Sequence, residues 1–170
     1  QREGDFDPTT YAERAGQRAE FAYGEGKRLA ETALARRAAV PVAMVRLPYV
    51  IGNDDYTVRF DFHVKRIAKG LPIASNGLDA RTSFIHRDEA ADFLFWLGRA
   101  EHFAPGPVNA CATGDVTLGA LFALIGKVVG REPRLLPIGA ATPAEAKTPY
   151  GQTRSGILDN ARGASLGFRF

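Results

Sequence analysis

Short apolar runs alternate along this chain with longer stretches whose apolar residues recur at helical spacing. The run Val42–Leu47 is typical of a strand buried on both faces, and Pro48 ends it. Further strands are predicted at residues 71–74, 82–86, 108–112 and 133–138. Helices are predicted between them at residues 56–69, 89–99 and 118–129. Strands that alternate with helices predict an α/β fold with a largely parallel sheet.

Residues that favour helix ends support these boundaries. Asp88 is placed to cap the helix at 89–99, while Thr117 and Gly130 are placed to begin and end the helix at 118–129. Residues 139–158 are rich in Ala, Pro, Gly and Thr, so we expect them to loop over the surface. A short turn at residues 159–166 is expected to dock the C-terminus.

The stretch from residue 11 to residue 37 is dense in Ala, Glu, Arg and Leu and predicts another helix. Gly24 and Gly26 interrupt it, and each costs a helix about 1 kcal/mol relative to alanine. Such a pair indicates close approach of another backbone or a ligand, and a break in the helix is the alternative.

Composition narrows the class of protein. The chain has 170 residues, 45% of them hydrophobic, and a net charge of +3, which suits one soluble domain and does not imply nucleic-acid binding. A single cysteine, Cys111, lies in an apolar run and is expected to be a buried packing residue. With no signal peptide and no long apolar run, the sequence favours a cytoplasmic protein without a membrane segment.

Tyr23 and Lys27 stand four residues apart, so a helix places them on one face. A lysine ammonium beside a phenol favours the phenolate and lowers the tyrosine pKa from about 10. The tyrosine then exchanges a proton with a sugar or alcohol hydroxyl near neutral pH. A tyrosine packed in a helix interface and a solvated lysine are the alternatives.

Four motifs resemble one family. Tyr23-x-x-x-Lys27 is followed by residues 46–52 (Arg-Leu-Pro-Tyr-Val-Ile-Gly), 84–91 (Phe-Ile-His-Arg-Asp-Glu-Ala-Ala) and 106–110 (Gly-Pro-Val-Asn-Ala). Their order and spacing resemble the C-terminal half of the extended short-chain dehydrogenases/reductases, the NAD-dependent epimerase/dehydratase family. The resemblance implies part of a Rossmann-type, doubly wound parallel sheet. It further implies that residues 1–52 complete a cofactor-binding domain and that residues 53–170 mainly bind substrate.

The resemblance also implies roles for individual residues. Tyr23 would be the catalytic acid/base, and Lys27 would assist it and hydrogen-bond the nicotinamide ribose. Pro48, Tyr49 and Val50 would contact the nicotinamide of NAD or NADP, although a proline that merely ends a strand explains the pattern equally well.

Substrate contacts are implied further along the chain. Asn53 and Asp54 would face substrate hydroxyls, and Arg81 would grip a phosphate of a nucleotide-sugar. His86 matches a family histidine, although a strand histidine and a solvated arginine are common without any such role. No metal site is predicted, because no His or Cys lies near the Asp pair that follows Asn53.

The chain departs from the family at two points. It contains no strand followed by a glycine-rich turn to hold a pyrophosphate, and no strand ending in Ser or Thr precedes Tyr23. We therefore expect the back half of a longer protein or a truncated product. A homodimer is expected by analogy alone.

Two rival functions stay open. A non-catalytic sensor or scaffold of the same family is the main alternative, and retention of both Tyr23 and Lys27 argues against it. A nucleic-acid-associated relative would need a basic stripe, which the sequence does not clearly show.

Overall fold

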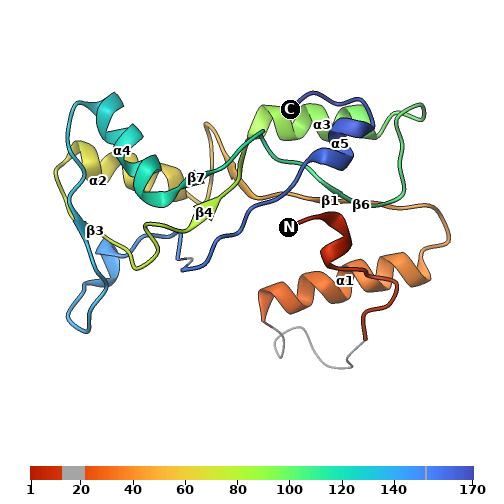
Figure 1. Ribbon diagram of the computed structural model, residues 1–170, viewed down its shortest axis with the longest axis horizontal. Coiled ribbons are helices and arrows are strands. Elements are labelled where there is room, and N and C mark those ends of the chain that lie inside the picture. Colours follow the sequence, from red (N-terminus) through yellow and green to blue (C-terminus); the bar gives the residue numbers. More distant parts are fainter. Residues whose placement is uncertain (13–21, 152) are drawn as a thin grey trace.

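The computed structural model describes residues 1–12, 22–151 and 153–170 (Figure 1). Its helices are α1 (Tyr23–Arg37), α2 (Arg59–Ala68), α3 (Arg87–Leu97), α4 (Leu118–Val129) and α5 (Ala161–Ser165), with short 3₁₀ turns η1 (Glu3–Asp5) and η3 (Ala144–Ala146). Its strands are β1 (Ala43–Arg46), β2 (Tyr49–Ile51), β3 (Ile73–Ala74), β4 (Arg81–Thr82), β5 (Phe84–His86), β6 (Gly106–Asn109), β7 (Val116–Thr117) and β8 (Leu135–Leu136).

The strands associate in pairs. β1 lies parallel to β6, β2 parallel to β5 and β3 parallel to β8, whereas β4 and β7 are antiparallel. The predicted parallel arrangement is thus confirmed for three pairs out of four. Pro48 separates β1 from β2, since proline has no backbone N–H to donate and ends the first ladder.

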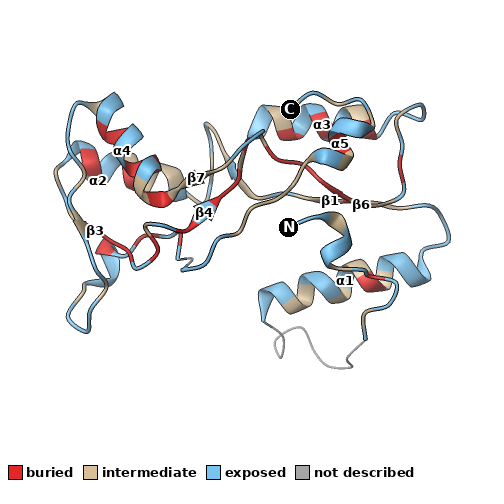
Figure 2. Cartoon of the chain, viewed as in Figure 1, coloured by how far each residue is buried: buried red, intermediate tan, exposed pale blue. Residues whose placement is uncertain are grey.

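Two apolar clusters hold these elements together. The first lies where α2 packs against α4, and its buried residues are Ile67, Ile73, Leu118, Leu121, Phe122, Ile125 and Tyr150. The second lies under α3, and its buried residues are Ile85, Ala90, Phe93, Leu97, Ala104, Val108 and Ala110. Figure 2 shows buried residues in α2, α3 and α4 and along β4 and β6, whereas α1 buries only Thr32. Helix α1 is therefore attached to the rest by few contacts.

Helix α1 and η1 lie on the side of the β1–β6 pair opposite to α3 and α5 (Figure 1). The helix begins at Tyr23, residues 11, 12 and 22 are not helical, and the predicted segment at 13–21 lies outside the described residues. It continues without a break through Gly24 and Gly26, so the alternative of a helix break at these glycines is wrong. A Cβ added at either glycine would meet nothing within 4 Å, so close approach of another described backbone is wrong as well.

Local chemistry explains how two of the helices begin. In α4 the Thr117 hydroxyl accepts a hydrogen bond from the Ala120 N–H at 3.1 Å, and Gly130 follows at φ 72°, as predicted. Helix α3 is different, because its cap is His86, whose Nδ1 accepts from the Asp88 N–H at 3.3 Å. The predicted Asp88 cap is wrong, since the helix begins one residue earlier than Asp88.

The segment after β8 was predicted to loop over the surface, but Ala146, Thr148 and Tyr150 within it are buried. Tyr150 is 1% exposed, and its ring packs 4.5 Å from Tyr49 and 4.8 Å from His63, measured between ring centroids. The Thr148 N–H donates to the Ala74 carbonyl at 2.9 Å, so the segment uses backbone groups of β3 that need a partner. The predicted docking of the C-terminus is confirmed, with Phe168 and Phe170 against Phe93.

Candidate functional site

Tyr23 and Lys27 come together on the first turns of α1. The Lys27 Nζ lies 5.5 Å from the centroid of the Tyr23 ring, over its face, and Tyr23 is 82% exposed. The phenol is thus open to solvent while a cation accompanies it. The helical spacing of the two residues therefore produces the predicted juxtaposition, although their catalytic roles stay a prediction.

Lys27 also lines a polar hollow of about 880 Å³ between the N-terminal segment, α1 and β1, which we call the lysine hollow. Arg46 forms part of its wall and is fully engaged. Its guanidinium donates to the Glu31 carboxylate at 2.7 Å and to the carbonyls of Glu3 and Phe6 at 3.0 Å each. These bonds fix α1 and the N-terminal segment onto β1.

The loop Gly52–Asp55 separates two further hollows. The first, the arginine hollow, has a volume of about 380 Å³, and its other lining residues are Pro48, Tyr49, Val50, Ile51, Tyr56, Thr57, Arg59 and Arg87. The second, the acidic hollow, has a volume of about 530 Å³, and its other lining residues are Ile51, Val58, Phe60, Asp61, Val64 and His86. The acidic hollow lies beyond the C-terminal end of β2, where ligands bind in open α/β sheets, whereas the arginine hollow also extends along β2 itself.

Arg87 holds this loop in place. Its Nη1 donates to the Asn53 carbonyl at 2.7 Å and to the Asp54 carboxylate at 2.9 Å, and the hydrogen bond to Asp54 raises the Arg87 pKa above its usual value. Asp54 has φ 60°, which is uncommon outside glycine. At Gly52, φ is 148° and a Cβ would lie 2.9 Å from the Arg87 Cγ, so glycine is required there.

Asp55 completes the loop by capping the chain that enters α2. Its carboxylate accepts from the Thr57 hydroxyl at 2.6 Å and from the Thr57 N–H at 2.9 Å. The hydroxyl bond is the main reason that the Asp55 pKa is lowered. Helix α2 therefore begins at Arg59 rather than at the predicted Tyr56, because this turn occupies the intervening residues.

Tyr49 forms an aromatic wall. Its ring packs against Tyr150 and lies 5.8 Å from the Phe84 ring, and burial raises the pKa of its hydroxyl. Pro48 and Val50 line the same hollow. The expected nicotinamide contact of all three stays a prediction, with the Tyr49 ring committed to the aromatic cluster.

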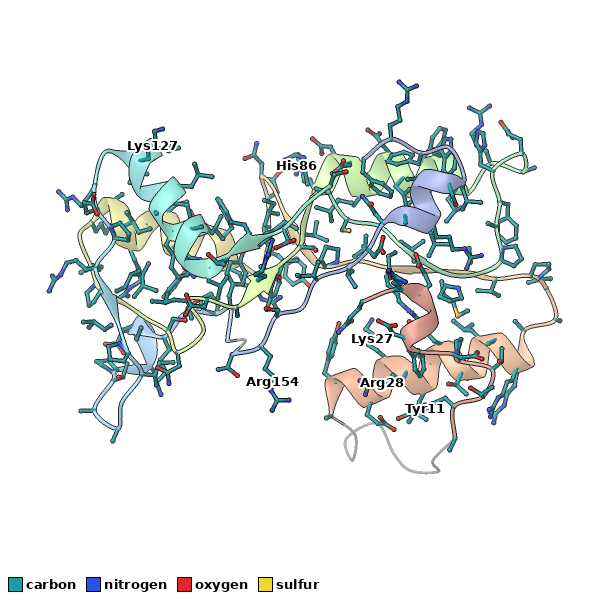
Figure 3. The ribbon with its side chains drawn as sticks, viewed as in Figure 1. Tyr11, Lys27, Arg28, His86, Lys127 and Arg154 are labelled. Carbon is teal, nitrogen blue, oxygen red and sulfur yellow. The ribbon has the colours of Figure 1, made fainter. Side chains whose placement is uncertain are left out.

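Arg81 lies apart from these hollows, on β4. Its Nε forms an ion pair with Asp115, and its N–H donates to the Ser155 hydroxyl at 3.1 Å. Lys27 is also separate from the arginine and acidic hollows. Figure 3 shows it well apart from His86, which lines the acidic hollow. The structure therefore gathers Pro48, Tyr49, Val50, Asn53, Asp54 and His86 around one loop, and leaves Tyr23, Lys27 and Arg81 elsewhere.

Potential metal ligands and the single cysteine among the described residues do not form a second candidate site. No cluster of three or more His, Cys, Asp or Glu side chains among them is arranged for a metal ion. Cys111 is buried as predicted, and burial raises its thiol pKa to about 11, so it is a poor nucleophile. Within the same residues, no helix has the length and apolarity needed to cross a membrane.

Comparison with known proteins finds similar solved structures. One is the UDP-glucose 4-epimerase of Thermus thermophilus in complex with NAD, with a TM-score of 0.62 and 14% identity over 85% of this chain and 47% of that one. The UDP-N-acetylglucosamine 4-epimerase of Methanobrevibacter ruminantium, in complex with UDP-N-acetylmuramic acid, gives 0.62 and 16% over 85% and 46%. WbmG of Bordetella bronchiseptica, in complex with NAD and UDP, gives 0.60 and 21% over 85% and 42%.

These similarities concern the fold. The chain spans less than half the length of each of these three structures, and it has the α/β, Rossmann-type fold of the part that it matches. The predicted fold class is therefore confirmed, and so is the predicted resemblance at the level of the fold. No protein-family model matches the sequence, and no curated protein matches it.

Proposed function

We propose that this chain is the C-terminal part of an NAD(P)-dependent epimerase, dehydratase or reductase that acts on a nucleotide-sugar or a related hydroxyl or carbonyl substrate. The observation that carries the proposal is the Tyr23–Lys27 pair on α1, with the lysine ammonium 5.5 Å from the ring centroid. The fold shared with NAD-complexed and UDP-sugar-complexed proteins supports it. Residues 1–52 would complete a cofactor domain, and residues 53–170 would mainly hold the substrate.

The residues present fit one end of the cofactor. The exposed Tyr23 hydroxyl and the Lys27 ammonium beside the lysine hollow are the donors that a nicotinamide ribose needs. When bound, the cofactor supplies the hydride chemistry. The sequence contains no glycine-rich turn after a strand, so this chain offers no residues of that kind for the pyrophosphate.

The chain's own residues would carry out the proton transfer. Tyr23 Oη would take the proton of a substrate hydroxyl or return one to a substrate carbonyl oxygen. The positive charge of Lys27 would stabilise the negative charge that develops on that oxygen. Asn53, Asp54 and His86 lie apart from Lys27, so from the loop between the arginine and acidic hollows they would hold a part of the substrate remote from the reacting hydroxyl.

The proposal is tested by binding and turnover together. We expect NADH or NADPH, followed by nicotinamide fluorescence, to bind the longest polypeptide of the gene more tightly than the 170-residue chain. In that polypeptide Tyr23→Phe should lower turnover of UDP-sugars by roughly a hundredfold or more, because acid–base catalysis contributes about 10²–10⁴. Cofactor affinity should fall much less, by roughly two- to tenfold, because Tyr23→Phe removes only one of the two donors to the ribose.

A matched lysine pair provides the control. Lys27→Met should weaken both cofactor binding and turnover, whereas Lys127→Met, on the last turn of α4 and far from Lys27 in Figure 3, should change neither. Cofactor binding with no effect of Tyr23→Phe would favour the sensor or scaffold alternative. Absence of binding by every form of the protein would refute the proposal. A homodimer stays a prediction, which light scattering can check.

A further inference from the structure

Helix α4 is apolar on every side, although only one side of it is covered. Among its 12 residues Lys127 is the single charged one. Its inner side, with Leu121, Phe122 and Ile125, packs against α2 in the first apolar cluster. A helix that is hydrophobic all round is normally buried on all sides. The exposed residues of α4 fall on one stripe at helical spacing, which we call the outer stripe: Ala120, Ala123, Leu124, Lys127 and Val128.

The outer stripe differs from the exposed sides of the other long helices. Its Leu124 and Val128 are 58% and 80% exposed. Helix α3 also exposes Leu94 and Phe95, but Asp92 is exposed beside them. The exposed sides of α1 and α2 carry several Lys and Arg residues. The outer stripe is therefore an apolar helix face that none of the described residues covers.

The position of α4 indicates that another molecule covers this face. Figure 1 shows α4 toward one end of the molecule and α1 toward the other, and Figure 3 shows Lys127 pointing away from the rest of the chain. Under the proposed function, a cofactor domain would continue from α1 and from the edge of β1 that pairs with no described strand. A domain joined there would lie at the end remote from α4 and would leave the outer stripe open.

The outer stripe is complementary to itself when two α4 helices run antiparallel. Ala120, Leu124 and Val128 form a ridge at four-residue spacing, with the smallest side chain at one end. A two-fold axis at Leu124 places Ala120 against Val128 of the second copy, so a small residue faces a larger one. The two Lys127 residues then lie about 9 Å apart along the helices, and each ammonium reaches water at the rim. A parallel pair would bring these like charges side by side.

We infer that the outer stripe of α4 is the interface with a second copy of this protein, packed antiparallel about a two-fold axis at Leu124. The helix is about 18 Å long, so the contact is smaller than the roughly 800 Å² per partner of a standard interface. We therefore expect a reversible dimer with a Kd on the order of 10 μM or weaker. The choice of a second copy over another part of the chain rests on the proposed function.

The test is sedimentation equilibrium of the longest polypeptide of the gene over a wide range of concentrations. Leu124→Asp should weaken the self-association at least about tenfold, because the contact would bury a charge at its centre. Phe95→Asp, an equally polar change at an exposed residue of α3, should alter it less than about twofold. Circular dichroism melts of both variants confirm that each is folded.

Cysteine cross-linking tests the orientation. In Leu124→Cys two thiols meet at the axis, and molecular oxygen with a copper catalyst should oxidise them to one disulfide, taking up the two electrons and two protons. In Lys127→Cys the thiols lie about 9 Å apart along the helices, so the linked dimer should form much more slowly. The wild-type chain, whose single Cys111 is buried, gives the background.

The outcomes separate this inference from the proposed function. A protein that stays monomeric at all concentrations would overturn the inference, and so would an unchanged association of Leu124→Asp or an equal loss in Phe95→Asp. Faster cross-linking of Lys127→Cys than of Leu124→Cys would overturn the antiparallel arrangement. The proposed function fails on different data, namely the lack of nicotinamide binding and of a Tyr23→Phe effect.

Discussion

Arg46 links α1 and the N-terminal segment to β1, so Arg46→Gln should weaken the attachment of α1 and lower the stability of the protein. The guanidinium reaches the Glu31 carboxylate and two carbonyls of the N-terminal segment, and its carbon lies 5.3 Å from the centroid of the Phe6 ring. Glutamine is too short to make these contacts together. The Glu31 carboxylate would then stay largely buried without its cation.

The structure sets the size of the effect. The side chains of Arg46 and Glu31 are 17% and 20% exposed, so the pair is mostly but not fully removed from water. Breaking a buried pair costs about 3–5 kcal/mol, and residual exposure favours the lower end, about 3 kcal/mol. For a chain of this length that loss lowers Tm by roughly 6–12 °C.

The assay is a thermal melt followed by circular dichroism, with hydrogen exchange to locate the change. Arg99→Gln is the control, because both side chains of its pair with Glu101 are exposed, 57% for Arg99 and 50% for Glu101. A pair of that kind contributes about 0–1 kcal/mol. Amides of α1 should exchange faster in Arg46→Gln alone. If both variants lose the same small stability, the argument that Arg46 anchors α1 is wrong.

Two further predictions concern stability. His63 is fully buried and stacked 4.6 Å from the Phe122 ring, and desolvation lowers its pKa to about 4. Since the unfolded histidine binds its proton from about pH 6.5, the protein should lose about 3 kcal/mol as pH falls from about 6.5 to about 4. His63→Phe should flatten that slope in urea melts, and an unchanged slope would contradict the assignment. Gly26→Ala should stabilise α1 by about 0.5–1 kcal/mol, because a Cβ there meets nothing within 4 Å. Gly126→Ala should destabilise α4, because its Cβ would lie 2.7 Å from the Arg131 carbonyl oxygen, and thermal melts that give the same sign for both variants would refute this contrast.

The sequence predicted those features that depend only on neighbouring residues, such as the ends of α4. Thr117 and Gly130 fix the two ends of α4 through their own hydroxyl and backbone freedom, so its bounds follow from the sequence alone. The cap of α3 could not be predicted in this way, because His86 Nδ1 accepts from the Asp88 N–H and the helix already begins at Arg87, which places Asp88 inside it. Spacing alone also brought Tyr23 and Lys27 together.

Contacts between segments that are distant in the chain could not be predicted from the sequence. Tyr150 lies in a stretch rich in Pro, Gly and Thr, and nothing local shows that its ring enters the core. Tyr49 was expected only to follow a strand, yet it begins β2 because Phe84 supplies the pairing partner.

The ring of Tyr150 has a consequence for how this protein can evolve. It packs against Tyr49 on β2 and against His63 on α2, so residues from both sides of position 52 share one core. An exchange of residues 53–170 with a related gene would bring in a new residue at position 150 against an unchanged Tyr49. Such a recombinant would lose packing unless both partners came from the same ancestor. Strand β2, which carries Tyr49, and the segment that carries Tyr150 should therefore be inherited together.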